Sequence, residues 1–300
     1  MKASRSSGLS RGAALALLAA ALDGCTADVL DPQGPVSGAE KMILLDSLAI
    51  MLTIIVPVIV GTLAFAWWYR ASNPRAKRRP DWAYSGRIEL VVWAIPALTI
   101  MFLGGVIWIS SHQLEPSKPL VSNRKAIEVQ AVSLDWKWLF IYPEQNVASL
   151  NQLVMPVGTP VHFSLTSASV MNSFFVPKLG SMIYTMNGMA TQLNLQADHP
   201  GAFHGLSTHF SGDGFPGMHF IAQAVPQAGF DAWVQRARAA GPMLDSPGYA
   251  QLAKQSSNVA PYTYRAVAPG LFKAVVTEAI PQAPGPPPKP SPTSPPEPEH

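Results

Sequence analysis

Two long runs without a charged residue lie in the first half of the chain, at Ser47 to Tyr69 and at Leu90 to Leu114. Each is long enough for an α-helix to cross a hydrocarbon core of about 30 Å, which needs ~20 residues. Pro57 and Pro96 lie inside these runs and favour modest kinks. The pattern therefore predicts a transmembrane helical hairpin over residues 43–114.

The connection between the two runs, residues 70–87, is rich in basic side chains. It contains six Lys or Arg residues and a single acidic residue, Asp81. An excess of Lys and Arg in a short loop marks the cytoplasmic side of a membrane. We therefore expect the N-terminus and everything after residue 115 to face the periplasm of a bacterial cell, with the hairpin in the inner (plasma) membrane.

After residue 115 the pattern changes to short runs in which Val, Phe, Leu and Thr alternate with polar residues, and Pro or Gly separates the runs. Such runs predict β-strands. About seven strands at this spacing favour an antiparallel sandwich or barrel over residues 115–226. The predicted strands are 126–134, 136–142, 160–166, 170–176, 191–197, 201–210 and 219–225.

The C-terminal region is predicted to be a helical extension over residues 227–280, followed by a tail. Helices are expected at 227–240 and 249–255, the first with an apolar face of Phe230, Trp233 and Val234. Residues 281–300 contain ten prolines and almost no large apolar side chains. That composition predicts a disordered or polyproline-like tail.

The N-terminus has the pattern of a processing signal. Three basic residues precede the apolar run Ala13 to Leu22, which predicts a signal peptide over residues 1–24. The sequence Leu22-Asp23-Gly24-Cys25 then resembles a bacterial lipobox and places the sole cysteine where lipid is attached. We expect a lipidated Cys25 that begins a periplasmic segment of residues 25–42. The alternative is a spectator cysteine beside a retained signal anchor.

Composition narrows the function further. The 300 residues are 48% hydrophobic and only 13% charged, which favours a membrane protein with a soluble domain. A net charge of +3 without a basic stripe gives no reason to expect nucleic acid as a partner. A single cysteine excludes an intrachain disulfide, a binuclear thiolate copper site, a blue-copper site and a zinc ribbon. No phosphate-binding loop, HExxH sequence or nucleophile elbow is present, so no catalytic residue is predicted.

The segment from residue 207 to residue 218 has the spacing of a copper-binding loop but not its ligands. A mixed-valence copper pair needs two thiolates four residues apart, a His four residues later and a Met three beyond that, because soft sulfur holds copper. Here the corresponding positions are Ser207, Ser211, Phe215 and Met218, of which only Met218 can ligate.

This loop resembles that of subunit II of the haem-copper terminal oxidases, and in particular that of the quinol-oxidising, cytochrome bo-type branch. Residues 170–175 resemble the strand that carries the first copper His in the cytochrome c-oxidising branch, with Asn172 at that position. Residues 134–138 resemble the family's aromatic segment, and residues 114–120 its exit from the second membrane helix. The resemblance covers residues 20 to 275 approximately.

The resemblance implies a cupredoxin-like barrel and a non-catalytic subunit of a proton-pumping quinol oxidase that reduces dioxygen to water. It implies no metal or other cofactor in this chain, with the haems and copper held by subunit I. The expected partners are subunit I, the other oxidase subunits, membrane lipid and the quinol that the complex binds. Two alternatives are a stand-alone, membrane-anchored cupredoxin-like module and a cytochrome c oxidase subunit II, which the missing copper ligands disfavour.

Glu89 lies within a turn of the second apolar run, where a carboxylate is costly unless it faces protein, water or the interface. The oxidase family places a Glu at this point, near the entrance of a proton-uptake pathway in subunit I, and residues 88–96 match that pattern. We therefore interpret Glu89 as a proton-pathway residue. The alternative is an interfacial Glu paired with Arg87.

Four of the seven histidines, His199, His204, His209 and His219, lie close together in the sequence. His204 is out of phase with the other three for a β-strand, so we interpret the group as solvated surface rather than as a metal site. Several methionines occur at irregular spacing between residues 171 and 218. They are interpreted as core or interface residues rather than as a copper(I) site.

Overall fold

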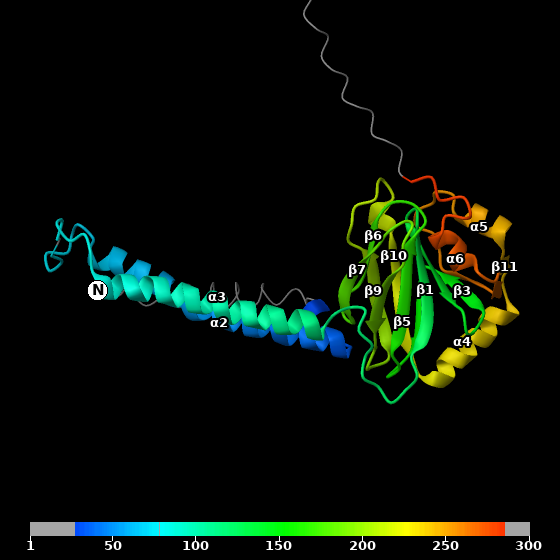
Figure 1. The fold of residues 1–300 in the computed structure, drawn as a ribbon, viewed down its shortest axis with the longest axis horizontal. Coiled ribbons are helices and arrows are strands. Elements are labelled where there is room, and N and C mark those ends of the chain that lie inside the picture. The colour runs from blue at the N-terminus through cyan, green and yellow to red at the C-terminus, as the bar shows by residue number, and fades with distance from the viewer. Residues whose placement is uncertain (1–27, 78, 286–300) are drawn as a thin grey trace, which may run out of the picture. The chain divides into compact units, whose positions relative to one another are not determined.

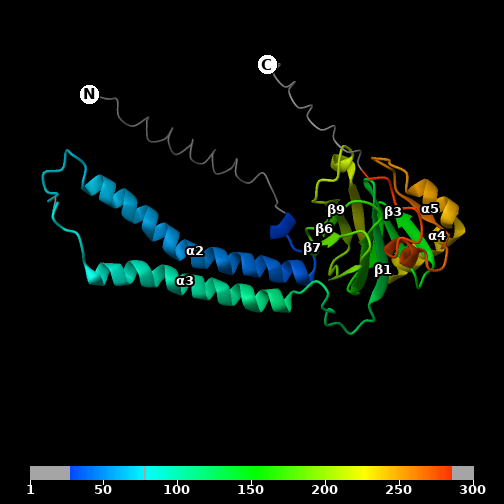
Figure 2. The same ribbon diagram turned by 45° about the horizontal axis from the view of Figure 1, so that its top comes forward.

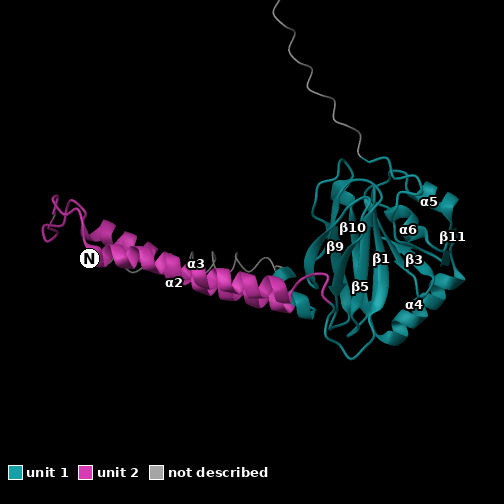
Figure 3. Ribbon diagram, in the orientation of Figure 1, with its two compact units in different colours: residues 1–37, 119–300 teal, residues 38–118 magenta. Residues whose placement is uncertain are grey.

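The computed structural model describes residues 28–77 and 79–285. Residues 38–118 form one compact unit, and residues 1–37 together with 119–300 form the other (Figure 3). Cys25 and the predicted signal peptide lie outside the described residues, as do residues 286–300.

The helical unit is built from the two predicted apolar helices. They are α2 (Pro35–Trp68) and α3 (Gly86–Gln113), and Figure 2 shows both as long helices joined by a loop. In the most apolar 18-residue window of each helix, no residue is buried inside the protein, as suits helices that face lipid. Helix α2 begins at Pro35, eight residues before the predicted start of the hairpin at residue 43. Proline favours the first position of a helix. The polar residues that follow Pro35 interrupt the apolar pattern, so the sequence predicted a later start.

The other unit contains a β-sandwich (Figure 1). Six-stranded sheet A has the order β12-β3-β2-β1-β5-β8, and five-stranded sheet B has the order β4-β10-β9-β6-β7. The strands of sheet A are β1 (Ile127–Leu134), β2 (Lys137–Tyr142), β3 (Val147–Leu150), β5 (Val161–Ser167), β8 (Thr191–Leu195) and β12 (Tyr262–Tyr264). Those of sheet B are β4 (Gln152–Pro156), β6 (Asn172–Val176), β7 (Gly180–Thr185), β9 (Gly201–Ser207) and β10 (His219–Val225).

The predicted cupredoxin-like sandwich is confirmed, with one difference in topology. The prediction was antiparallel, but β1 pairs with β5 in parallel, and β4 pairs with β10 in parallel. Both pairs join strands that are far apart in the sequence, so the chain must cross between the sheets rather than turn back as a hairpin. The result is two mixed sheets that enclose one core.

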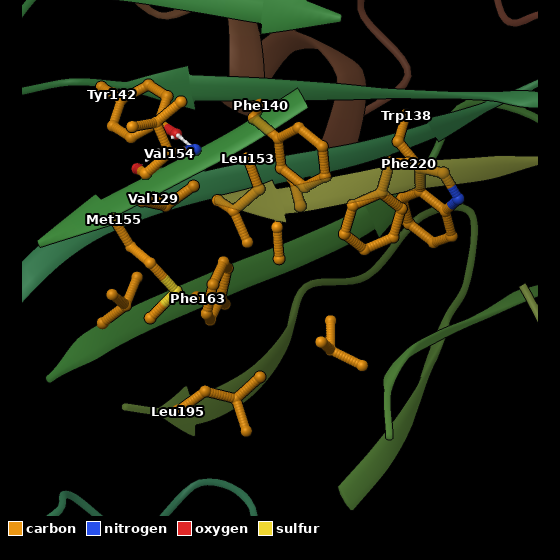
Figure 4. Packing of buried hydrophobic residues seen from close by; sticks show 14 of the residues in the cluster. Val129, Trp138, Phe140, Tyr142, Leu153, Val154, Met155, Phe163, Leu195 and Phe220 are labelled. Atoms are coloured by element: carbon orange, nitrogen blue, oxygen red, sulfur yellow. Dashed lines mark hydrogen bonds between the residues drawn. The ribbon is translucent and has the colours of Figure 1, made fainter. Parts of the chain in front are cut away.

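Aromatic side chains fill the space between the sheets. Trp138 and Phe140 of β2 lie against Phe220 of β10, with ring centroids 5.8 and 5.1 Å apart respectively (Figure 4). Phe174 of β6 stacks on Phe220 at 5.2 Å. Tyr142 closes one end, because its hydroxyl donates to the carbonyl of Val154 at 2.9 Å and accepts from the amide of the same residue at 2.8 Å. These contacts lock β2, β4, β6 and β10 together.

The predicted C-terminal helices are confirmed, and the extension that carries them also contains short strands, one of which joins sheet A. Its helices are α4 (Gln227–Ala239), α5 (Ser246–Leu252) and α6 (Leu271–Val276), and its other strands are β11 (Met243–Leu244) and β13 (Ala266–Val267). Helix α4 packs Trp233 against Tyr142 with ring centroids 5.0 Å apart. A second apolar cluster fills the outer face of sheet A beneath α5 and α6.

The predicted tail begins later than residue 281. The amide of Ala283 donates to the carbonyl of Ala168 at 2.8 Å, and the side chain of Ala283 is buried. The amide of Gly285 donates to Oδ2 of Asp135 at 3.0 Å. Residues 281–285 therefore belong to the β domain, because their backbone groups supply partners for it despite the proline content.

Candidate functional site

The positions that correspond to copper ligands come together at one end of sheet B. Asn172 begins β6, Ser207 ends β9, and Ser211 and Met218 lie in the connection to β10. Because β6 and β9 are antiparallel neighbours, the start of one strand meets the end of the other. These four residues are buried, and none is more than 5% exposed.

The four side chains form two contacting pairs. Oγ of Ser207 donates to Oδ1 of Asn172 at 3.3 Å, and Oγ of Ser211 lies 3.9 Å from Sδ of Met218. Nδ2 of Asn172 donates to the carbonyl of Val170 at 3.2 Å. The polar atoms of Asn172 and Ser207 are thus satisfied by nearby groups, as buried polar atoms must be.

Phe215, the fifth position, belongs to the same connection but points its ring elsewhere. It begins the short 3-10 turn η3 (Phe215–Gly217), and its ring packs edge-on against Phe210 at 5.5 Å. His209 places its ring 6.0 Å from that of Tyr184, and within the described residues its buried Nδ1 has no hydrogen-bond partner. The carbonyl oxygen of His209 lies 3.4 Å from Oγ of Ser207 and is a second acceptor within reach of that hydroxyl.

Trp136 covers this loop, a role that the sequence pattern did not reveal. It occupies the turn between β1 and β2 with φ 63°, and its Nε1 donates to the carbonyl of Ser211 at 2.9 Å. The indole lies so close to Gly214 that a Cβ there would be 2.2 Å from ring atom Cδ2. The available signal was the resemblance of residues 134–138 to the family's aromatic segment.

The donor set of this loop does not fit copper. It offers two hydroxyls, one amide and one thioether, whereas a copper pair needs thiolates and imidazoles. The hydroxyl and amide groups are also engaged in hydrogen bonds with their neighbours. The buried side chains of Asn172, Ser207 and Ser211 thus form a closed polar cluster, and Trp136 covers the loop that carries the two serines.

Glu89 lies in the first turn of α3, and its backbone amide donates to the carbonyl of Ser85 at 3.0 Å. Its side chain is exposed. The ion pairs found among the described residues involve Lys125 and Lys178, and none joins Glu89 to Arg87. The carboxylate is therefore available to face water or another chain.

The four histidines do not share one strand, so the phase argument from sequence was wrong for two of them. His204 lies on β9 and His219 on β10, and their rings stack with centroids 5.6 Å apart. Odd and even positions mark opposite faces only within one strand, so they do not predict which residues of two different strands share a face. His199 is exposed away from any strand. Among the described residues, no group of three or more His, Cys, Asp or Glu side chains could hold a metal.

The soluble part of the chain is similar to known proteins. A family model described as "Cytochrome C oxidase subunit II, periplasmic domain" matches residues 143–225, and "COX Aromatic Rich Motif" matches residues 238–280. A solved periplasmic domain of cytochrome oxidase subunit II from Bradyrhizobium japonicum is similar at 23% identity and TM-score 0.37, covering 38% of this chain and 96% of that one. The two family models, taken with the two apolar helices, describe a membrane-anchored subunit with a periplasmic domain.

Two relatives match almost the whole chain. "Cytochrome bo(3) ubiquinol oxidase subunit 2" of Pseudomonas aeruginosa is 49% identical over 257 residues, which is 86% of this chain and 78% of the relative. "Ubiquinol oxidase subunit 2" of Acetobacter aceti is 47% identical over 274 residues, or 90% and 89% of the two chains. The chain belongs to this family, subunit II of the haem-copper quinol oxidases.

Proposed function

We propose that the chain is a copper-free, non-catalytic subunit II of a proton-pumping ubiquinol oxidase, which reduces dioxygen to water. The observation that carries the proposal is the closed polar cluster of Asn172, Ser207 and Ser211, whose oxygen and amide groups are poor ligands for copper. The names of its close relatives support quinol as the electron donor of the complex.

The resemblance to the oxidase family implies a division of labour within the complex. The haems, the copper at the oxygen site and quinol oxidation belong to subunit I, and this chain contributes assembly and a periplasmic cap. The other oxidase subunits and membrane lipid complete its partners. A lipid on Cys25 adds a second anchor beside the two spans. Mass spectrometry of the mature chain tests the anchor, since an unmodified Cys25 or a start before residue 25 contradicts it.

The principal experiment compares two electron donors with the purified native complex. Ubiquinol should sustain rapid oxygen consumption, whereas reduced cytochrome c should give only background. Robust cytochrome c turnover overturns the copper-free assignment. Co-purification of the chain with a large haem-containing subunit is expected, and its isolation alone would favour the stand-alone module.

We also propose that Glu89 stands at the entrance of the proton-uptake path. A carboxylate at the cytoplasmic start of a membrane span can take protons from water and pass them on. Its exposed side chain and the lack of an ion pair to Arg87 in the described residues support this role.

The matched variants are Glu89→Ala, Glu89→Asp and, as a control in the loop that precedes α3, Asp81→Ala. Glu89→Ala should assemble normally but slow proton-coupled reduction of the oxygen site, and its turnover should fall more steeply as pH rises. Glu89→Asp should retain most of the rate because it keeps a protonatable group, and Asp81→Ala should match wild type. If the Glu89→Ala complex turns over and pumps protons like wild type, the proton-pathway role is contradicted and Glu89 is only an interfacial residue.

A further inference from the structure

The outward face of sheet B carries a pair of imidazoles. In the antiparallel β9–β10 ladder, His204 lies opposite Ile221 and His219 lies opposite Leu206, so the two histidines are diagonal neighbours on one face. Both are exposed. Their ring centroids are 5.6 Å apart, and the ring planes differ by 22°.

We propose that His204 and His219 form a binding site for a divalent transition metal ion of borderline softness, with Zn²⁺ as the probe. Imidazole nitrogen is a preferred ligand for such ions. A metal bound by two imidazoles at about 2.1 Å in cis places the ring centroids roughly 4.5 to 5.2 Å apart. The observed separation is close to this range, and small side-chain rotations close the difference because both rings are exposed.

The backbone beneath the pair is rigid, which lowers the cost of holding the two ligands. The inward-facing neighbours Phe203 and Phe220 are buried in the core between the sheets. Gly205 allows the ring of Phe220 to lie directly beneath β9, because a Cβ at residue 205 would be 2.2 Å from Cζ of that ring. The strands therefore keep their register when the metal binds, and little conformational entropy is lost.

Two histidines supply only half of a tetrahedral shell. No third His, Cys, Asp or Glu completes a cluster among the described residues, so water fills the remaining positions. The site is open rather than closed, and it lies on the outward face of sheet B, although His219 directly follows Met218 of the loop that corresponds to the copper pair.

The test is Zn²⁺ titration of the purified full chain in detergent, by calorimetry and by competition with a chelator. Wild type should bind one Zn²⁺ whose affinity falls at least about tenfold in His204→Ala and equally in His219→Ala. The double variant should have the same Zn²⁺ affinity as either single variant, because the loss of one histidine already removes two-ligand binding. His199→Ala, which removes an exposed histidine elsewhere on the domain, is the matched control and should leave binding unchanged.

Thermal unfolding provides a second readout. Zn²⁺ should raise the Tm of wild type and of His199→Ala but not that of the pair variants, since a ligand that binds only the folded state stabilises it. The metal-free Tm values should agree, because exposed substitutions perturb folding little. Additive losses from His204→Ala and His219→Ala, or an equal loss from His199→Ala, overturn the proposal in favour of scattered surface binding.

Discussion

Nε1 of Trp136 donates a hydrogen bond to the carbonyl oxygen of Ser211, 2.9 Å away. Trp136 reaches this position with φ 63°, in the left-handed region that bulky residues rarely adopt. The indole then lies across Gly214. One side chain from the turn between β1 and β2 therefore holds in place the loop that corresponds to the copper site, although the loop lacks the metal ligands that would otherwise fix it.

The contact between Trp136 and Gly214 predicts a strong effect of a single methyl group. Gly214→Ala should destabilise the β domain by about 1–3 kcal/mol, because the new Cβ overlaps the indole ring. Denaturant unfolding of the full chain, followed by tryptophan fluorescence, measures the loss. Asp213→Ala is the control in the same loop and should change stability by less than about 0.5 kcal/mol, since residue 213 is exposed. Equal stability of both variants would show that the indole moves aside freely.

The first described residues form a strap, residues 28–37, that binds the β domain. The amide of Gln33 donates to the carbonyl of Lys178 at 2.7 Å, and the amide of Ser37 donates to that of Leu179 at 3.3 Å. Nζ of Lys178 lies 2.9 Å from Oδ2 of Asp31, and this carboxylate raises the pKa of Lys178. The strap is thus held by backbone hydrogen bonds and by the buried side chains of Val36 and Ser37, because the ion pair is exposed to solvent and contributes little.

Two glycines test the strap. A Cβ on Gly34 would lie 2.2 Å from the carbonyl oxygen of Gln196, whereas a Cβ on Gly38 meets nothing within 4 Å. Gly34→Ala should lift the strap and speed hydrogen exchange of the Gln33 and Ser37 amides at least about tenfold. Gly38→Ala should leave these rates unchanged. Similar exchange in both variants would mean that the strap contributes no local stability.

Residues 281–285 should matter more than the rest of the C-terminus. Asp135 is buried and accepts from Oγ of Ser169 at 2.6 Å and from the amide of Gly285. Truncation after Ile280 should cost about 1–3 kcal/mol of unfolding free energy, because it leaves one carboxylate oxygen without its partner. Truncation after Gly285 should leave stability and turnover near wild type. The reverse order of effects would assign the docking role to residues 286–300.

Lys137 makes stability depend on pH. Its side chain is 1% exposed, and burial lowers its pKa to about 8, although the carboxylate of Asp135 opposes the shift. Between pH 8 and its usual value of 10.5 the unfolded chain binds the proton and the folded chain does not, so stability rises with pH across this window. The gain should be on the order of 1–3 kcal/mol. Lys137→Met should remove this rise from denaturant unfolding curves, and an unchanged pH dependence would contradict it.

Most of the architecture could be predicted from residue patterns, and the failures have physical causes. The two helices and seven of the strands follow from uncharged runs and from alternation. Strands β3, β4 and β7 of the sandwich were missed. Nearly every residue of β3 and β4 is buried, which removes the alternation of a half-exposed strand, whereas β7 does alternate in burial. The parallel pairs β1–β5 and β4–β10 depend on long-range crossings that no local pattern encodes.

The candidate site was predictable only in part. Spacing and resemblance identified Asn172, Ser207, Ser211 and Met218, and the antiparallel pairing of β6 and β9 brings them together. The position of Trp136 over the loop was not predictable, because it depends on a left-handed backbone conformation and on a hydrogen bond to Ser211, 75 residues away in the sequence. The pairing of His204 with His219 likewise depends on the register between two strands.

The loop that corresponds to the copper site can be tested by restoring its missing ligands. If the loop keeps the geometry of the family, ligands supplied at the corresponding positions should restore a copper pair. The substitutions are Asn172→His, Ser207→Cys, Ser211→Cys, Phe215→His and His209→Glu, with Met218 retained. Two thiolates would bridge the metals, the imidazoles would bind one each, and Met218 would give a weak axial sulfur. The parent and the variant should both carry His204→Asn and His219→Asn, so that the surface pair does not bind copper.

In this background the variant chain should take up close to two coppers and develop thiolate-to-copper absorption, whereas the parent should take up none. Partial occupancy is acceptable, because the order of the surrounding hydrogen bonds also sets metal affinity. Residue 215 is the position least well placed to supply a ligand, because the ring of Phe215 packs against Phe210 and the new imidazole must turn inward to reach the metal. A folded variant without copper would mean that the loop matches the copper site in spacing alone. Tight, stoichiometric copper binding by the parent would instead refute the copper-free assignment, because the buried hydroxyl and amide cluster would then be a competent site.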